Sequence, residues 1–128
     1  MGYEAGMIKH GDRVSLKWVG DILVAEGHGA YNEEGMIEVV TDLKESVLKS
    51  GLSSWYRIEI WNDVIGSPEV FELVSEMYNW CKEHGCLATA VVITNRVQEK
   101  VIEEKLPNIV GVFSEKEQAM AWLKAQRA

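Results

Sequence analysis

The stretch that decides the fold is IVGVFSEKEQAMAWL at residues 109–123, near the end of the chain. Its first five residues form a short β-rich run that stops at Ser114. The Ser114 hydroxyl can accept a hydrogen bond from the N–H of Glu117 while the Glu117 carboxylate returns one, a capping box that opens an amphipathic helix. The stretch therefore predicts a strand that leads straight into a helix.

The same β-α unit recurs upstream, where the hydrophobic spacing changes between two and about 3.6 residues. Residues 1–9 carry no periodicity and predict a loose leader. A hairpin follows, with strands over 14–18 and 22–25 joined at Gly20. The further expected elements are a helix from Asn32 to Gly51, a strand over 55–61, a helix over 67–85, a strand over 87–94, a helix over 95–105, a strand over 109–113 and the final helix.

The resulting order, β-β-α-β-α-β-α-β-α, predicts a single α/β domain over residues 10–128. Helices that alternate with strands through short loops require parallel pairing and right-handed crossovers, whereas the first strand of the hairpin runs antiparallel. Within the strand over 55–61, apolar residues alternate with Arg57 and Glu59. We therefore expect one face of the sheet to be partly exposed to water.

The charge balance limits the kinds of partner. The chain of 128 residues has a net charge of −7, from 13 basic and 20 acidic residues. Such a surface repels nucleic-acid backbones and anionic lipid, so we expect no nucleic-acid partner and no charge-driven membrane contact. With two cysteines and no signal segment, the chain is expected to be cytoplasmic with reduced thiols.

The element order and the closing VFSEKEQAMAWL, in which Phe113 precedes Ala119, Ala121 and Trp122, resemble the SpoIIAA-like proteins. These are relatives of the STAS domain (sulfate transporter and anti-sigma-factor antagonist) and share their arrangement with the CRAL-TRIO lipid carriers. The resemblance covers residues 10–126. It implies strands in sequential order, with helices mainly on one face.

The resemblance also implies a place for a phosphorylation switch. Regulatory STAS domains carry an Asp-Ser pair after the third strand, and a kinase that is also a partner phosphorylates the serine. The matching segment here contains Asn62, Asp63 and Ser67, but no acid directly precedes Ser67 and Pro68 follows it, so the switch motif is not reproduced. Ser67 is a candidate phosphate or partner site, or simply a helix cap. Asn62 and Asp63 fit either a ligand site at a strand end or an ordinary turn.

Two further clusters carry little chemistry. Cys81, His84 and Cys86 have the spacing of a metal site but lack a fourth ligand nearby, so no metal is expected. His28 lies between two glycines, where a ligand could approach the backbone, yet no nucleophile or partner is identifiable for a general base. The sequence predicts no catalytic residue and no cofactor.

Aromatic residues suggest binding surfaces instead. Trp80 borders the apolar stripe of its helix and either closes the core or anchors a partner. A second aromatic group, together with one methionine, either surrounds an apolar ligand or belongs to the core. Its members are Tyr31, Met36, Trp61 and Phe71, with Trp18 as a further candidate at the hairpin.

The sequence therefore supports two hypotheses. The first is a non-enzymatic, bacterial-type regulatory or protein-binding module, whose partner would be a protein such as a kinase or a sigma-factor regulator. The alternative, which the CRAL-TRIO similarity implies, is a carrier of a small apolar ligand, a lipid or fatty acid, with membrane association. The open edge of the hairpin and Trp80 are also compatible with a homodimer.

Overall fold

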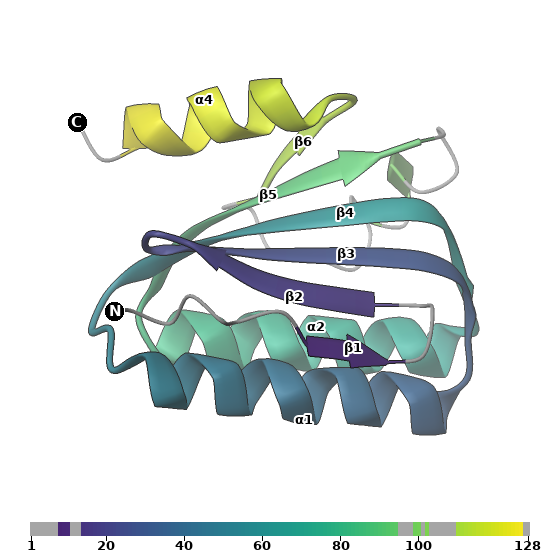
Figure 1. The fold of residues 1–128 in the computed structure, drawn as a ribbon. Coiled ribbons are helices and arrows are strands. Elements are labelled where there is room, and N and C mark those ends of the chain that lie inside the picture. Colours follow the sequence, from purple (N-terminus) through teal and green to yellow (C-terminus); the bar gives the residue numbers. More distant parts are fainter. Residues whose placement is uncertain (1–7, 11–13, 95–98, 101, 103–109, 127–128) are drawn as a thin grey trace.

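The computed structural model describes residues 8–10, 14–94, 99–100, 102 and 110–126. Six strands form one sheet in sequential order (Figure 1). Strands β1 to β3 pair antiparallel and strands β3 to β6 pair parallel, which confirms the predicted α/β fold class. The elements are β1 (Ile8–His10), β2 (Val14–Val19), β3 (Ile22–Tyr31), α1 (Glu33–Ser50), β4 (Trp55–Gly66), α2 (Pro68–Glu83), β5 (Cys86–Ile93), β6 (Val110–Phe113) and α4 (Lys116–Gln126).

The beginning of the chain differs from the prediction. Ile8 and Lys9, expected in a loose leader, form β1 together with His10 and pair with residues 14–16 of β2. The hairpin edge that was expected to be open is therefore partly covered by the chain itself. The rest of the expected leader, residues 1–7, lies outside the described residues.

The helix expected over 95–105 falls largely outside the described residues. Glu99, Lys100 and Ile102 are helical, and Ile102 is buried in the core. At the end of the chain, α4 begins at Lys116, one residue later than a cap at Ser114 predicts. The Ser114 hydroxyl donates to Oε1 of Gln118 at 3.5 Å, and the N–H of Ala119 donates to the carbonyl oxygen of Glu115 at 3.3 Å, which places the start of the helix at Glu115.

Local signals set the ends of α1 as predicted. The Asn32 side chain accepts a hydrogen bond from the N–H of Gly35 at 2.7 Å, which satisfies one of the free donors of the first turn. At the other end Gly51 adopts the left-handed conformation, with φ of 70°, which is the usual helix stop.

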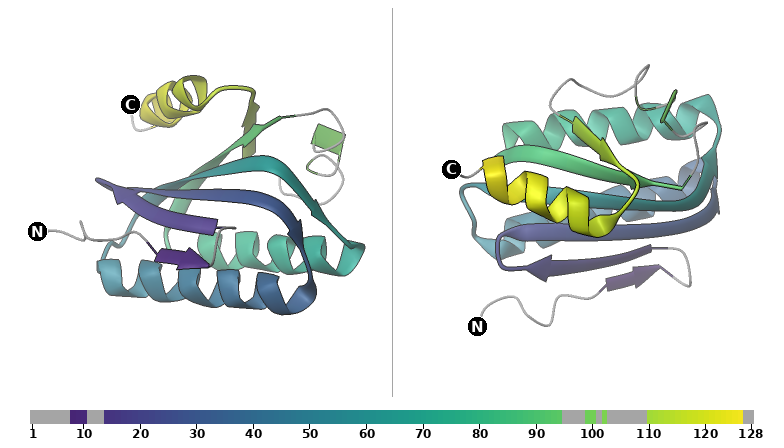
Figure 2. Two further views of the ribbon diagram at one scale, coloured as in Figure 1. Left: turned by 45° about the vertical axis from the view of Figure 1, so that its right-hand side comes forward. Right: turned by 90° about the horizontal axis from the view of Figure 1, so that it is seen from above.

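Helices cover both faces of the sheet (Figures 1 and 2). Helices α1 and α2 pack side by side on one face, where a core cluster includes Trp55, Leu43 and Val74. Helix α4 lies on the other face, where Ala119 and Leu123 pack into a second cluster. Two of the three helices α1, α2 and α4 therefore lie on one face, which agrees with the prediction of helices mainly on one face.

The prediction that one face of the sheet is partly exposed to water is wrong. The side chains of Arg57 and Glu59 point to the α1 and α2 face, and these residues are only 0% and 6% exposed. The apolar residues that alternate with them, among them Ile58, are buried under α4 on the other face. Strand β4 is central and covered on both sides, so Arg57 and Glu59 are accommodated inside the core.

Candidate functional site

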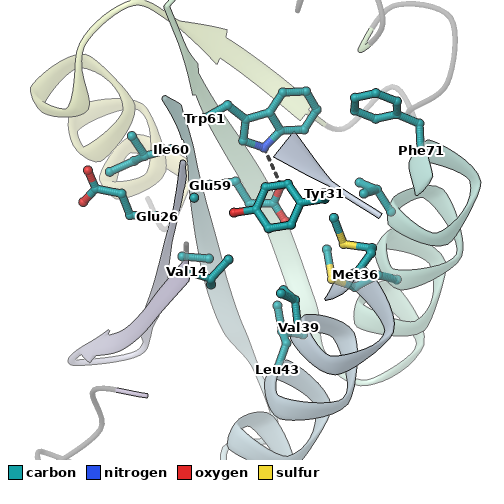
Figure 3. Close-up of a pocket in the computed structure, with 14 residues that line it drawn as sticks. Val14, Glu26, Tyr31, Met36, Val39, Leu43, Glu59, Ile60, Trp61 and Phe71 are labelled. Atoms are coloured by element: carbon teal, nitrogen blue, oxygen red, sulfur yellow. Dashed lines mark hydrogen bonds between the residues drawn. The ribbon is translucent and has the colours of Figure 1, made fainter. Parts of the chain in front are cut away.

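A cavity lies between the sheet and the α1 and α2 layer (Figure 3). Its volume is about 60 Å³, and its walls are mostly apolar. All four residues predicted to surround an apolar ligand line it: Tyr31, Met36, Trp61 and Phe71. Trp18 is not part of the lining. Its ring packs edge-on against Trp55, with the centroids 5.8 Å apart, and its Nε1 donates to the Ser46 hydroxyl at 3.0 Å.

The aromatic residues come together because β3 and β4 run parallel and end at the same edge of the sheet, where α1 and α2 begin. Trp61 and Phe71 rings lie 5.9 Å apart and tilted by 38°. The Tyr31 hydroxyl accepts a hydrogen bond from the backbone N–H of His28 at 3.1 Å, which fixes that ring. Figure 3 shows these three rings at one end of the cavity and Leu43 at the other.

A buried carboxylate forms part of the cavity wall. Glu59 Oε1 accepts hydrogen bonds from Trp61 Nε1 at 2.9 Å and from the Tyr78 hydroxyl at 3.2 Å. Its other oxygen, Oε2, lies 3.4 Å from Nη1 of Arg57. Three partners thus compensate a group that would otherwise be costly to bury. The sequence did not single out Glu59 as a site residue; the one available signal was a charged residue inside an otherwise apolar strand.

Arg57 is held in the same network. Its Nη1 donates to Sγ of Cys81 at 3.2 Å, and its guanidinium carbon lies 4.0 Å from the centre of the Tyr78 ring. Within the described part of the chain, the buried Nε and Nη2 atoms have no hydrogen-bond partner. Arg57 is therefore compensated through three contacts, with the Cys81 thiol, the Tyr78 ring and the Glu59 carboxylate.

Burial and neighbouring groups shift the pKa values of Cys81, Tyr78 and Arg57 in this network. Burial raises the pKa of the Cys81 thiol to about 11, so it stays protonated at neutral pH. Burial also raises the pKa of Tyr78, and Glu59 adds to that shift. Burial lowers the pKa of Arg57, but Cys81 and then Glu59 outweigh this effect, and the pKa ends above its usual range. Glu59 is the carboxylic side chain of this network in contact with Arg57.

A polar cluster lies in the carboxyl-terminal halves of β3 and β4, on the opposite face from the cavity. Strand β4 runs on to Gly66, so Asn62 and Asp63 lie within the strand and not in the expected turn after it. Nδ2 of Asn62 donates to Oε2 of Glu26 at 2.9 Å, and Nε2 of His28 lies 3.8 Å from the same oxygen. Strand alternation places Glu26 and His28 on the side of Val24, which is the α4 face. Asn62 and His28 are thus brought together, while the side chain of Asp63 lies outside the described residues.

Ser67 caps α2. Its hydroxyl accepts a hydrogen bond from the N–H of Val70 at 3.3 Å, and Pro68 occupies the first turn. The residue is exposed and directly follows β4. The capping role that the sequence predicted is thus present, on a side chain that a partner can reach.

Trp80 lies far from Ser67 on the same helix. Thirteen residues at about 1.5 Å each put them roughly 20 Å apart along α2. Trp80 is half-buried, stacks on His84 with ring centroids 3.9 Å apart, and has Nζ of Lys44 at 5.5 Å from its ring. The two residues predicted to contact a partner therefore cannot belong to one small contact point.

The Cys81, His84 and Cys86 group does not converge on a common point. Cys81 and Cys86 are buried free thiols, whereas Nδ1 of His84 lies 2.8 Å from the carbonyl oxygen of Trp80. Across the described residues, no group of three or more histidine, cysteine or acidic side chains has the arrangement of a metal site. None of the helices in that part of the chain is long and apolar enough to cross a membrane.

Solved structures share this topology over most of its length. An uncharacterized protein of the DUF3478 family from Shewanella loihica PV-4, which has a SpoIIAA-like fold, matches with a TM-score of 0.62 and 19% identity. The match covers 86% of this chain and 91% of that protein. The chain has the SpoIIAA-like fold. The resemblance derived from the element order is thereby confirmed at the level of the fold.

Two structures of SpoIIAA support the same conclusion. The phosphorylated form of the Bacillus cell fate determinant SpoIIAA matches with a TM-score of 0.59 and 14% identity, over 86% of this chain and 98% of that one. The anti-sigma factor antagonist SpoIIAA in its unphosphorylated form matches with a TM-score of 0.58 and 13% identity, over 90% and 99%. No protein-family model matches this chain, and no curated protein matches it significantly.

Proposed function

We propose that this protein is a non-enzymatic, regulatory protein-binding module that contacts its partner through the start of α2. The observation that carries the proposal is the exposed Ser67 hydroxyl, placed directly after β4 at the first turn of α2. The chain shares its fold with an anti-sigma factor antagonist whose phosphorylated form is also known. A kinase or a sigma-factor regulator is therefore the kind of partner we expect.

The segment before Ser67 departs from the switch motif of the regulatory relatives, because it lacks an acid directly before the serine. We therefore propose binding without the usual phosphorylation switch.

Ser67→Glu tests the proposal, because it places a negative charge at the contact surface while a glutamate at the helix start remains compatible with the helix dipole. Partners would be cross-linked in cells, identified by mass spectrometry and titrated as purified proteins against wild type and variant. We expect a Kd at least about tenfold higher for Ser67→Glu, with the melting temperature nearly unchanged. Ser114→Glu, the same change at another exposed serine, is the matched control and should bind as wild type does.

Three results would refute this function. One is the lack of any stoichiometric protein partner for the wild type. Another is a loss of stability in Ser67→Glu that accounts for its weaker binding. The third is an equal loss of binding in Ser114→Glu.

A second candidate function, a carrier of a small apolar ligand, is favoured by the cavity. A buried apolar cavity of about 150 Å³ binds benzene, so a cavity of about 60 Å³ cannot hold an acyl chain unless α1 or α2 moves. Because the cavity is too small for an acyl chain, we rank the ligand carrier below the protein-binding module. It predicts a lipid or fatty acid in organic extracts of the purified protein, and a change in tryptophan fluorescence when that ligand is removed, since Trp61 lines the wall. An empty protein whose fluorescence and stability do not respond to delipidation would exclude it.

A further inference from the structure

An open groove runs between α1 and α2, separate from the cavity, with a volume of about 190 Å³. Its lining combines apolar and charged side chains from both helices. They include Ile37, Val40 and Lys44 of α1 and Leu73, Glu76 and Met77 of α2.

Apolar residues remain exposed along the α1 side of this groove. Ile37 is 52% exposed and Leu48 is 64% exposed. They are 11 residues apart, with Thr41 and Lys44 between them at helical spacing, so they lie along one stripe. On α2, Leu73 and Trp80 are seven residues apart and also share a stripe, and both are half-buried against the core. Single exposed apolar residues are common, but exposed Ile37 and Leu48 beside a groove that Ile37 and Leu73 line indicate a surface suited to a partner.

The charge of the protein is concentrated on these two helices. Helix α1 contains five acidic residues and two lysines, and α2 contains four acidic residues and one lysine. Their combined net charge is −6, out of −7 for the whole chain. Helical spacing places Glu69, Glu76 and Glu83 beside the Leu73 and Trp80 stripe, and these acids are all partly or fully exposed to water. The apolar groove is therefore bordered by carboxylates.

We propose that this groove binds a basic amphipathic helix of a partner protein. The inference rests on the proposed protein-binding function and names the surface and the chemistry of the partner. Leucine-like anchors spaced three, four and seven residues apart would cover Ile37 and Leu73, and flanking lysines or arginines would meet the glutamates. Helix α1, with 18 residues, offers about 27 Å of length.

The charges select this occupant over others. A second copy of the chain that docks through the same face would bring −6 against −6, and an anionic bilayer would be repelled in the same way. Lys44 is the basic residue in the lining, and its Nζ lies 5.5 Å from the centre of the Trp80 ring, so its charge is partly engaged within the protein.

The test uses a displayed library of 18-residue helical peptides with leucine fixed at positions i, i+3, i+4 and i+7 and the other positions randomised among Lys, Glu, Gln and Ala. Selection is on the intact wild-type protein. We expect enriched peptides with a net positive charge, and affinities that fall as salt rises. Ile37→Arg and Glu76→Lys should each weaken their binding at least about tenfold. Leu87→Arg, at a residue that is 56% exposed on β5, and Glu117→Lys on α4 are the matched controls and should change the Kd less than about twofold.

Each outcome of this experiment supports or overturns the proposed groove. Enrichment without positive charge, no enrichment at all, or equal weakening in the Leu87→Arg and Glu117→Lys controls would overturn the proposal. Self-association that Ile37→Arg abolishes would assign the groove to a second copy. A partner that depends on Ser67 but binds Ile37→Arg as tightly as wild type would refute the groove and leave the proposed function standing. Lack of any partner would refute the function itself.

Discussion

The buried ion pair of Arg57 and Glu59 gives the sharpest prediction on stability. The two groups are 3.4 Å apart, which corresponds to about 5 kcal/mol of attraction at an effective dielectric constant of about 20. Removing two charges from water costs several kcal/mol per ion, so attraction and desolvation largely cancel. The pair should therefore contribute little net stability, while each member alone is strongly unfavourable in the core.

A double-mutant cycle separates these effects. Arg57→Met leaves the Glu59 carboxylate with its two neutral donors, and Glu59→Leu leaves a buried cation without its carboxylate partner, in addition to the Nε and Nη2 atoms that already have no hydrogen-bond partner among the described residues. Each single substitution should lower the free energy of unfolding by about 3–5 kcal/mol. The double substitution should cost less than either single one, because no uncompensated charge remains.

Urea unfolding, followed by tryptophan fluorescence and far-UV circular dichroism, measures all four corners of the cycle. A total stability of about 5–15 kcal/mol means that a single variant can be largely unfolded, in which case recovery in the double variant is the readout. Glu117→Gln, at an exposed residue on α4, should stay within about 0.5 kcal/mol of wild type. Single substitutions that each cost less than about 1 kcal/mol, or costs that simply add in the double variant, would refute this view of the pair.

Three further predictions concern stability. The pKa of Cys81 is raised from 9.0 to about 11, so the folded protein keeps the thiol proton to a higher pH than the unfolded chain does. The free energy of unfolding should therefore keep the whole contribution of this shift below pH 9 and lose about 2–3 kcal/mol between pH 9 and 11. Urea unfolding should find a smaller loss in Cys81→Ala. Gly85→Ala should lower the free energy of unfolding by about 2 kcal/mol or more, because φ is 97° and the added Cβ would collide with the carbonyl oxygen of Ser53. Gly20→Ala is the control, since φ is 61° and the space around it is open, and it should cost clearly less. Equal costs in the two variants would contradict the explanation. Asn32→Ala should cost about 1 kcal/mol in the same assay and Asn32→Ser should recover most of it, whereas no recovery would show that capping is not the cause.

The order of the elements was predictable because its signals are local. The Asn32 cap, Gly51 in the left-handed conformation and the Ser67-Pro68 start of α2 each act within a few residues. The predicted start of α4 is wrong by one residue, and the Ser114 hydroxyl donates to Gln118. Local hydrogen-bonding options of this kind compete within a fraction of a kcal/mol to about 1 kcal/mol, too little for the sequence alone to decide between them.

The burial of Arg57 and Glu59 could not be predicted by the same means. Alternation along β4 shows that the two residues share a face, but it does not show what covers that face. The compensation comes from Tyr78 and Cys81 on α2, which are about 20 residues away in sequence. The alternation therefore predicts that a polar residue on a central strand is exposed, although the core supplies partners for it.

The cavity was predicted in part for a topological reason. Tyr31 ends β3, Trp61 lies in the second half of the parallel strand β4, and Phe71 lies in the first turn of α2. All three are therefore near one edge of the sheet, which is known once the strand order is known. The pairing of Asn62 with Glu26 depends instead on the register between β3 and β4 and on the irregularity after His28, which the sequence does not reveal.

The inner cavity and the outer groove are not independent, because Met77 lines both. This side chain is 3% exposed and separates the two spaces. A ligand larger than the cavity has to displace α1 or α2, and either movement changes the distance between the stripes that border the groove. A helix bound across α1 and α2 opposes that displacement. Binding at the two sites should therefore be mutually antagonistic, since each favours a different spacing of the same two helices.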